Sequence, residues 1–274
     1  TGHYARLDSF TDENGTETFQ LLAGKDNNKD QSYFLCQLNQ KQLSKALFPI
    51  GELTKPEVRE VAREMGLVTA DKKDSQGLCF IGKVSLPQFL QQQLVPKEGE
   101  IVEIFNDFVE FSKEKPQFSS KLEELQFLSN KIKYHKSDGK VIGKHQGAQF
   151  YTIGQSKGLG IGGHKESCFI VSRDMENNIL FVGEGKNFPG LYRKALKIEN
   201  SEVHWVREDL RLKTGESMNV QARIRYRQPL EEATLYQYEE GFFIEFENPQ
   251  SAIAEGQFAA WYDGEELLGS GVIS

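Results

Sequence analysis

The C-terminal part of the chain, from residue 191 onward, contains only strand patterns. Its apolar residues alternate with polar ones or form short continuous runs, and no segment has the period of an amphipathic helix. Turn residues such as Gly241 and the pair Asp263-Gly264 separate the runs. Many short strands without helices between them favour a closed antiparallel β-barrel, because closure removes exposed sheet edges. The expected strands cover residues 218–226, 233–238, 242–246 and 258–262.

The N-terminal region mixes strands with helices. Two apolar segments, 4–10 and 19–22, flank a polar turn containing Asn14-Gly15, which is typical of a β-hairpin. A polar loop follows, and apolar residues at helical spacing then predict a helix that starts at Gln31. This region is therefore expected to be of mixed α/β type.

The clearest helix of the sequence follows Thr54. Thr54 and Glu57 have the spacing of a capping box, and Gly66 supplies a C-terminal stop. The apolar residues between them recur at the spacing of a single helix face. That face consists of Val58, Val61, Ala62 and Met65.

The middle of the chain combines short strands with irregular segments. Residues 71–83 have neither helical nor alternating period and form a loop that carries Cys79, and a helix is expected between Ser85 and Pro96. The charged, Phe-containing stretch 106–137 interrupts the strand pattern like an insertion. The expected strands are 100–104, 139–143, 149–153, 168–172 and 179–182.

Composition limits the class of protein. The chain has 274 residues, 38% of them hydrophobic and 27% charged, which suits two or three globular domains. It carries neither a long apolar run nor a signal peptide, so we expect a cytoplasmic protein without a membrane segment. The net charge of -7 means that any RNA binding must come from a local basic surface. Because the chain opens at Thr1 without an initiator Met, we expect a fragment.

Three cysteines stand far apart, which argues against a structural disulfide framework or a zinc site. Cys36 and Cys168 lie among apolar residues and are expected to be small buried hydrophobes. Cys79 lies in a polar loop, where a reactive thiol would have access to its partner. From the residues alone, Cys79 is either catalytic or structural.

The glycine-rich run 154–165 approaches the pattern of a phosphate-binding loop but departs from it. His164 stands where a Walker A motif needs Lys, and a strand is expected to follow in place of a helix. We therefore expect a loop between strands. The five histidines show no metal-ligand spacing, and no metal site is expected in the chain.

Three arginines alternate near the end of an expected barrel strand. In a regular strand Arg223, Arg225 and Arg227 would project from one face, and the residues between them from the other. Two interpretations remain open: a row of guanidinium groups suits an RNA backbone, and it equally suits a solvated outer face with carboxylates such as Glu231 and Glu232 as partners.

Six blocks of sequence resemble, in the same order, the tRNA-specific 2-thiouridylase family. The resemblance covers nearly the whole chain. The order matters, since any one block alone would be weak evidence. The blocks are TGHYARL, NKDQSYFL, LFPIGELTKPEVREVAREMGL, KDSQGLCFIG, YTIGQSKGLGIGG and ARIRYRQP.

The resemblance implies an enzyme that uses ATP to adenylate C2 of the wobble uridine in tRNA. A cysteine persulfide then delivers sulfur to C2, AMP leaves, and a second cysteine resolves the persulfide as a disulfide. Cys79 matches the persulfide cysteine, which suits the task because its terminal sulfur is a good nucleophile. The implied partners are tRNAs of the Lys, Glu and Gln type and an upstream sulfur carrier or cysteine desulfurase. A magnesium ion could accompany ATP.

The resemblance also implies a set of binding residues. Gly2 matches a position that contacts ATP, and His3 beside it matches one that approaches tRNA. Arg225 and Tyr226 should face opposite ways in a regular strand, so a bulge or a strand end is needed for both to reach RNA. The expected tRNA-binding residues are His3, Lys29, Asp30, Gln31, Arg225, Tyr226 and Gln257.

The family fold implies three parts: residues 1–85 as the C-terminal part of an ATP-pyrophosphatase-type α/β domain, 86–190 as a small central α+β domain, and 191–274 as an antiparallel β-barrel that binds tRNA. The family's SGGxDS-type ATP motif and first catalytic cysteine are absent from the sequence, so the chain alone is expected to be inactive. Ser156 replaces an Arg common in the family's glycine-rich run, which puts local tRNA contacts there in doubt, as does the insertion 106–137.

Two other functions can be compared with the sequence. The barrel and central domain could form a non-catalytic RNA-binding module in which Cys79 is incidental. A tRNA methyltransferase is disfavoured, because a methyl-donor site normally lies on a glycine-rich strand-helix unit and the sequence shows none.

Overall fold

The computed structural model describes residues 1–72 and 94–274. The chain forms two compact units. The first consists of Thr1–Lys72, Lys194–Asn248 and Glu255–Ser274, and the second of the described part of Lys73–Arg193 with Pro249–Ala254. Cys79 and the helix expected after Ser85 lie outside the described residues.

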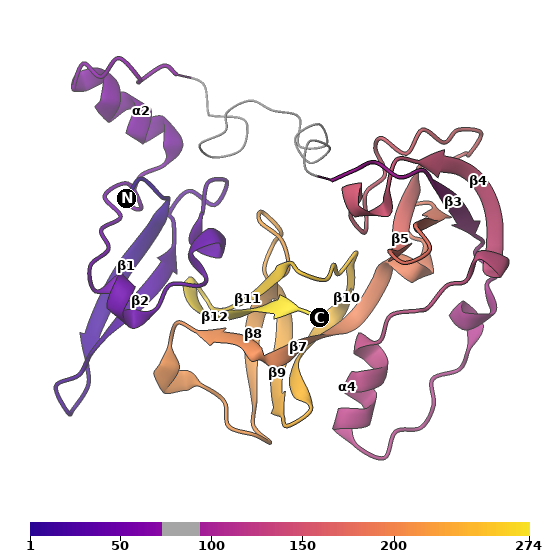
Figure 1. The fold of residues 1–274 in the computed structure, drawn as a ribbon. Coiled ribbons are helices and arrows are strands. Elements are labelled where there is room, and N and C mark those ends of the chain that lie inside the picture. The colour runs from indigo at the N-terminus through magenta and orange to yellow at the C-terminus, as the bar shows by residue number, and fades with distance from the viewer. Residues whose placement is uncertain (73–93) are drawn as a thin grey trace. The chain divides into compact units, whose positions relative to one another are not determined.

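The first unit is built on an eight-stranded sheet with the order β1-β2-β12-β11-β8-β9-β10-β7. An additional pairing of β12 with β7 closes the C-terminal strands into a barrel, which confirms the expected antiparallel β-barrel (Figure 1). The barrel strands are β7 (Tyr192–Trp205), β8 (Ser217–Arg223), β9 (Glu231–Tyr238), β10 (Gly241–Ser251), β11 (Phe258–Asp263) and β12 (Glu266–Ile273).

The predicted hairpin is confirmed and extends the barrel sheet. Strands β1 (Ala5–Thr11) and β2 (Glu17–Ala23) pair antiparallel around a turn in which Gly15 has a positive φ of 81°. The first residues of β12 pair with β2, while its later residues pair with β7. One apolar core therefore joins the hairpin to the barrel. Its buried members are Ala5, Leu21, Cys36, Leu43, Val206, Ala260, Tyr262 and Leu267.

Three short helical elements follow the hairpin. The helix expected from Gln31 is wrong, since only a 3-10 turn, Ser32–Leu35, forms there. The buried Asp30 carboxylate accepts the Ser32 amide at the start of this turn. Asn39 then caps α1 (Gln40–Leu43).

Helix α2 (Lys55–Glu64) is confirmed together with its capping box, in which the Thr54 amide donates to the Glu57 carboxylate at 2.6 Å. None of its residues is buried, and Val61 and Met65 on the expected apolar face are 43% and 69% exposed. Its capping and propensity therefore stabilise this helix more than core packing does.

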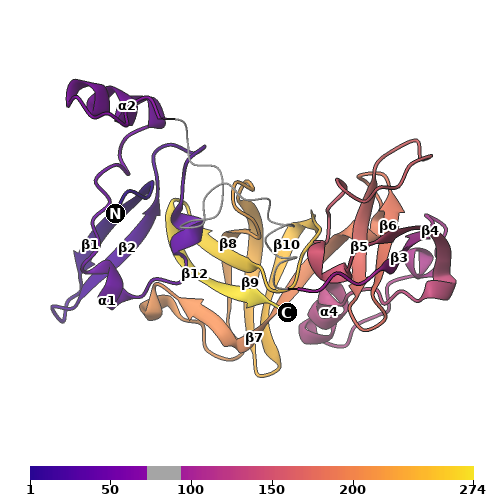
Figure 2. The ribbon, with the colours of Figure 1, turned by 45° about the horizontal axis from the view of Figure 1, so that its top comes forward.

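The second unit contains a four-stranded sheet with the order β4-β3-β6-β5 (Figure 2). The central strands run parallel and the outer pairs antiparallel. Alternate residues feed two separate cores, so Val102 and Phe181 pack on one face and Ile101 and Val182 on the other. The strands are β3 (Gly99–Ile104), β4 (Gly139–His145), β5 (Cys168–Asp174) and β6 (Ile179–Glu184).

The stretch 106–137, expected as an insertion, covers one face of this sheet. It contains a 3-10 turn, Val109–Ser112, and helix α4 (Lys121–Ser129), whose first turn is capped by Ser120. Tyr134 is buried, and its ring lies 5.5 Å from that of Phe108 and 5.6 Å from that of Phe181. The insertion thus contributes aromatic side chains to the core.

The strand expected at 149–153 is wrong. A 3-10 turn, Ala148–Phe150, occupies this stretch, and glycines with positive φ, Gly147 and Gly154, bend the backbone at both ends. Three further 3-10 turns in the described chain are Lys136–Asp138, Pro189–Leu191 and Glu208–Leu210. Among the residues that the structure describes, no helix has the length and apolarity needed to cross a membrane.

Candidate functional site

A buried polar network ties the segment after the hairpin to the barrel. The Arg223 guanidinium donates to the Asp30 carboxylate at 2.5 Å and to the Tyr262 hydroxyl at 2.6 Å. The other Asp30 oxygen accepts the amides of Gly24 and Ser32. Each of these charges is paired and hydrogen-bonded, as a buried ion pair requires. The network therefore fixes the position of residues 30–34 on the barrel.

The predicted alternation of three arginines is wrong beyond Arg223. Strand β8 ends at this residue, and the following backbone turns, with Arg227 at a positive φ of 65°. The strand end resolves the conflict over Arg225 and Tyr226, since neither needs to obey strand alternation. Arg223 itself is buried and forms an ion pair with Asp30. It therefore belongs neither to a solvated face nor to an RNA-facing row.

An aromatic pair, with Phe34 exposed and Tyr226 half-buried, lies beside this strand end. The rings of Phe34 and Tyr226 are 4.4 Å apart with a 43° interplanar angle, and Phe34 is 57% exposed. The Arg227 guanidinium lies over the Tyr226 ring at 5.2 Å. Arg225 is half-buried, and burial lowers the pKa of its guanidinium. We call Phe34, Arg225, Tyr226 and Arg227 the aromatic-arginine surface.

Tyr33 connects this surface to the start of β11. Its hydroxyl donates to the Phe258 carbonyl at 2.8 Å and approaches the Ile224 carbonyl at 3.4 Å. Burial raises the pKa of Tyr33 to about 12, so the hydroxyl remains a donor at neutral pH. The two hydrogen bonds of the Tyr33 hydroxyl join the start of β11 to the residue after β8. Gln257, a predicted binding residue, directly precedes Phe258 and so lies on this joined segment.

The remaining predicted binding residues lie along two joined segments. Gln31 pairs with Tyr4 through its backbone amide and its side chain, at 2.8 and 3.0 Å. This pairing joins the segment of Lys29 to the segment of Gly2 and His3. Gly2 is exposed, and the His3 ring forms a hydrogen bond with the Thr1 hydroxyl at 2.5 Å.

Asp30 differs from its neighbours, because its carboxylate is buried and bonded inside the protein. Sequence reasoning missed Phe34 in the same segment. The available signal was weak: Phe34 follows Tyr33 just after the polar run 25–32, so two aromatic residues border a polar segment.

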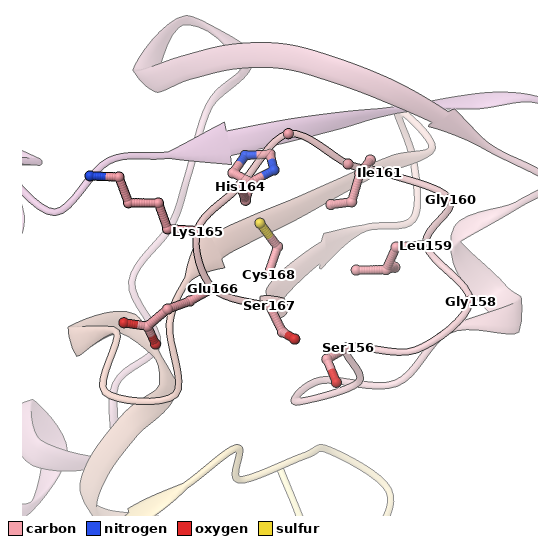
Figure 3. Close-up of a pocket in the computed structure, with 12 residues that line it drawn as sticks. Ser156, Gly158, Leu159, Gly160, Ile161, His164, Lys165, Glu166, Ser167 and Cys168 are labelled. Carbon is pink, nitrogen blue, oxygen red and sulfur yellow. The ribbon is translucent and has the colours of Figure 1, made fainter.

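The glycine-rich run lines a pocket of about 390 Å³ in the second unit (Figure 3). Gly158, Gly160 and Gly163 have positive φ, a conformation that other residues rarely adopt. Strand β5 follows the loop, as expected, in place of the helix that a phosphate-binding loop would need. No pattern in the sequence indicates this pocket.

Two of the three cysteines lie in the described residues, and both are buried as expected. Burial raises the pKa of the Cys36 thiol. Burial, together with the carboxylates of Glu103 and Glu184, raises the pKa of the Cys168 thiol to about 11. Neither is therefore a thiolate at neutral pH in the protein alone.

Comparison with known proteins divides the chain into three matched regions. Residues 1–83 match a model described as tRNA methyl transferase HUP domain, residues 123–184 one described as tRNA methyl transferase PRC-barrel domain, and residues 195–273 one described as aminomethyltransferase beta-barrel domain. These regions confirm the expected fold class, with an α/β domain, a small central domain and a C-terminal β-barrel.

Relatives match the chain from end to end. The tRNA-specific 2-thiouridylase MnmA of Flavobacterium johnsoniae is 60% identical, that of Christiangramia forsetii 57% and that of Karelsulcia muelleri 46%, each over 274 residues. Each alignment covers 100% of this chain and 69% of the relative. On this continuous similarity, the chain belongs to the tRNA-specific 2-thiouridylase family.

Proposed function

We propose that this chain is part of an ATP-dependent sulfurtransferase that converts the wobble uridine of tRNA to 2-thiouridine. Relatives named tRNA-specific 2-thiouridylase match the chain over its whole length, which supports thiolation of a tRNA uridine. The observation that carries it furthest is the aromatic-arginine surface. An exposed ring and a half-buried ring beside guanidinium groups suit unpaired bases and the phosphates that join them.

The proposed chemistry has three steps. ATP adenylates the C2 oxygen of uridine and releases pyrophosphate. The terminal sulfur of a persulfide on Cys79 attacks C2 and displaces AMP. A thiolate from a second cysteine then attacks the sulfur of Cys79, which breaks the S–S bond, leaves sulfur on C2 and forms a protein disulfide. A reductant and a sulfur carrier, or a cysteine desulfurase, must regenerate the persulfide.

Residues at the barrel end and the N-terminal segment are proposed to hold the tRNA. Arg225 and Tyr226 lie next to exposed Phe34, while Lys29, Gln31 and His3 lie on segments joined through Tyr4. Because the net charge is -7, such a local surface is necessary for an anionic partner. We propose that Asp30 acts by positioning this segment through Arg223, and that Gln257 contributes from the start of β11.

The complete enzyme is proposed to use ATP, with magnesium, at a site formed mainly by a PP-loop of the SGGxDS type. No such motif occurs in the 274 residues, so we propose that the chain alone does not adenylate uridine, although Gly2 contributes to the ATP site. We retain the three-part division at 85 and 190, the cytoplasmic location and the tRNAs of the Lys, Glu and Gln type as parts of the same proposal.

The function is tested by thiolation of a wobble-uridine tRNA by the complete protein, supplied with ATP and a sulfur donor. We expect Cys79→Ser to abolish both 2-thiouridine and the persulfide trapped by mass spectrometry. The matched control is Cys36→Ala, which removes a buried thiol and should retain both. If Cys79→Ser still thiolates tRNA, the persulfide assignment is wrong.

The alternative is a non-catalytic tRNA-binding module, which the same surface would also suit. It predicts that Arg225→Ala weakens tRNA binding while Cys79→Ser leaves thiolation by the complete protein unchanged. The two variants together therefore distinguish an enzyme from a binding module.

A further inference from the structure

Three side chains that could bind a metal converge in the second unit. Glu103 comes from β3, Cys168 begins β5, and His164 lies at the end of the glycine-rich run. Their ligand atoms, one from each residue, all lie within 4.8 Å of one another. Residues 1–72 and 94–274 contain no other group of three His, Cys, Asp or Glu side chains that meets this condition.

The sheet explains why the three residues meet. Strand β6 separates β3 from β5, and Val182 of β6 pairs with Glu103 on one side and with Ile170 on the other. Alternation then places Glu103 and Cys168 on the same face of the sheet as Val182. The glycine-rich run crosses that face, where Leu159 packs into its core, and so delivers His164 to the other two.

The contacts among the three favour a preformed site. The Glu103 carboxylate lies 3.0 Å from the Nε2 atom of His164, and Figure 3 shows the Cys168 sulfur directed toward the same imidazole. Glu103 and Cys168 are only 8% and 5% exposed. A buried carboxylate is costly unless its charge is compensated, and a bound cation would compensate it.

We propose that Glu103, His164 and Cys168 form a binding site for one zinc ion. Sulfur, imidazole nitrogen and carboxylate oxygen are the donors that zinc prefers, and a thiolate, a carboxylate and a neutral imidazole together balance a divalent charge. Three protein ligands are typical of zinc sites that keep one coordination position for water or another small ligand.

The neighbouring pocket provides room for that additional ligand. His164 and Cys168 both line it, and its volume is about 390 Å³. A Cβ atom built on Gly160, Gly162 or Gly163 would meet no atom within 4 Å, so the loop leaves open space around the site. By contrast, the Lys165 and Glu166 side chains point away from the Cys168 sulfur in Figure 3.

This site was not expected from the sequence, which showed no metal-ligand spacing among the histidines. Glu103 and His164 are 61 positions apart, so only the sheet reveals their proximity. The zinc site is independent of the proposed sulfur transfer, because it uses neither Cys79 nor the aromatic-arginine surface.

Metal titration of the purified, reduced and chelator-treated 274-residue chain tests the proposal. We expect one equivalent of Zn²⁺ to bind. With Co²⁺ as the probe, we expect a thiolate-to-cobalt charge-transfer band and the strong visible absorption of a four-coordinate ion, both removed by Zn²⁺. Cys168→Ser should lose the charge-transfer band and weaken Zn²⁺ binding by at least about 10- to 100-fold, the range found when even a supporting residue is removed.

Matched variants keep the test decisive. Cys36→Ala and Cys79→Ser each remove another thiol and should retain the band and the affinity. Should Cys168→Ser fail to fold, His164→Ala, which changes a loop residue, must still lose Zn²⁺ affinity while its circular dichroism is unchanged. The proposal is overturned if the unmodified chain binds no stoichiometric Zn²⁺, or if the charge-transfer band persists in Cys168→Ser.

Discussion

Two regions at the end of β8 use arginine in opposite ways. Arg223 is buried, and its guanidinium is paired with Asp30 and with the Tyr262 hydroxyl. Four residues further, the Arg227 guanidinium lies over the Tyr226 ring, which contacts the exposed ring of Phe34. Saturated polar contacts inside the protein indicate a structural role, whereas exposed rings and guanidinium groups leave surface that a partner can cover. The predictions below separate the two roles.

The largest expected effect is on stability. In Asp30→Ala the Arg223 guanidinium remains buried but loses the carboxylate that it is paired with. The Gly24 and Ser32 amides also lose the oxygen that accepts their hydrogen bonds. Breaking one partner of a buried pair costs about 3–5 kcal/mol of the free energy of unfolding. Chemical denaturation measures this loss. Asp8→Ala, on an exposed part of β1, is the control, and an equal effect of both variants would contradict a special role for the network.

The next effect is on RNA affinity. Tyr226→Ala removes a ring that contacts Phe34 and stacks under Arg227, and stacking of a base on an aromatic side chain contributes about 1–3 kcal/mol. We expect tRNA binding to weaken by this amount while the denaturation midpoint stays unchanged. Tyr226→Phe retains the ring and should retain the affinity. A loss of stability without a loss of affinity would reverse the assignment.

Tyr33→Phe tests the link between the two regions. The hydrogen bond to the Phe258 carbonyl is lost, at a cost of about 0.5–1.5 kcal/mol. The wild-type chain also has a pH dependence here, because burial raises the pKa of Tyr33 from 10.0 to about 12 in the folded state. The unfolded state then binds fewer protons between these values, so the free energy of unfolding falls as pH rises from about 10 to about 12. Unfolding curves across this range should show a shallower fall for Tyr33→Phe.

The smallest effect is local. Thr54→Ala removes the N-terminal cap of α2, which typically costs about 1 kcal/mol of helix stability. Because no α2 residue is buried, we expect faster amide exchange in Lys55–Glu64 with little change in the unfolding of the barrel. Thr54→Ser retains the hydroxyl and should exchange like the wild type. Destabilisation of the whole first unit by Thr54→Ala would contradict this separation.

The sequence predicted the elements whose signals are local. The Asn14-Gly15 hairpin, the Thr54 capping box and the barrel strands all depend on neighbouring residues, and all three are confirmed. At Gln31 a 3-10 turn forms where a helix was expected. Asp30 beside it bonds to a residue 193 positions away, a contact that no local pattern contains. Glu103 and His164 are also far apart in the sequence, so no local pattern predicts that they meet.

The candidate site was predicted in part. Similarity to a family supplied Arg225, Tyr226 and the segment of Lys29. Alternation alone predicted a regular strand at Arg225, which is not what the structure has there. Strand β8 ends at Arg223, where the buried ion pair forms and the chain turns. Phe34 was not predicted, and its ring contact with Tyr226 places it at this surface.

The most direct test of the central claim, that the end of β8 binds tRNA, compares Arg225→Ala with Arg211→Ala. Both variants remove one arginine from the barrel unit, and Arg211 pairs with Glu208 on an exposed turn. The measurement is the affinity of the chain for a wobble-uridine tRNA across a series of salt concentrations. We predict that Arg225→Ala weakens binding and reduces the salt dependence by about one ion, whereas Arg211→Ala does neither. Equal affinities and equal salt dependence for the two variants would contradict the account.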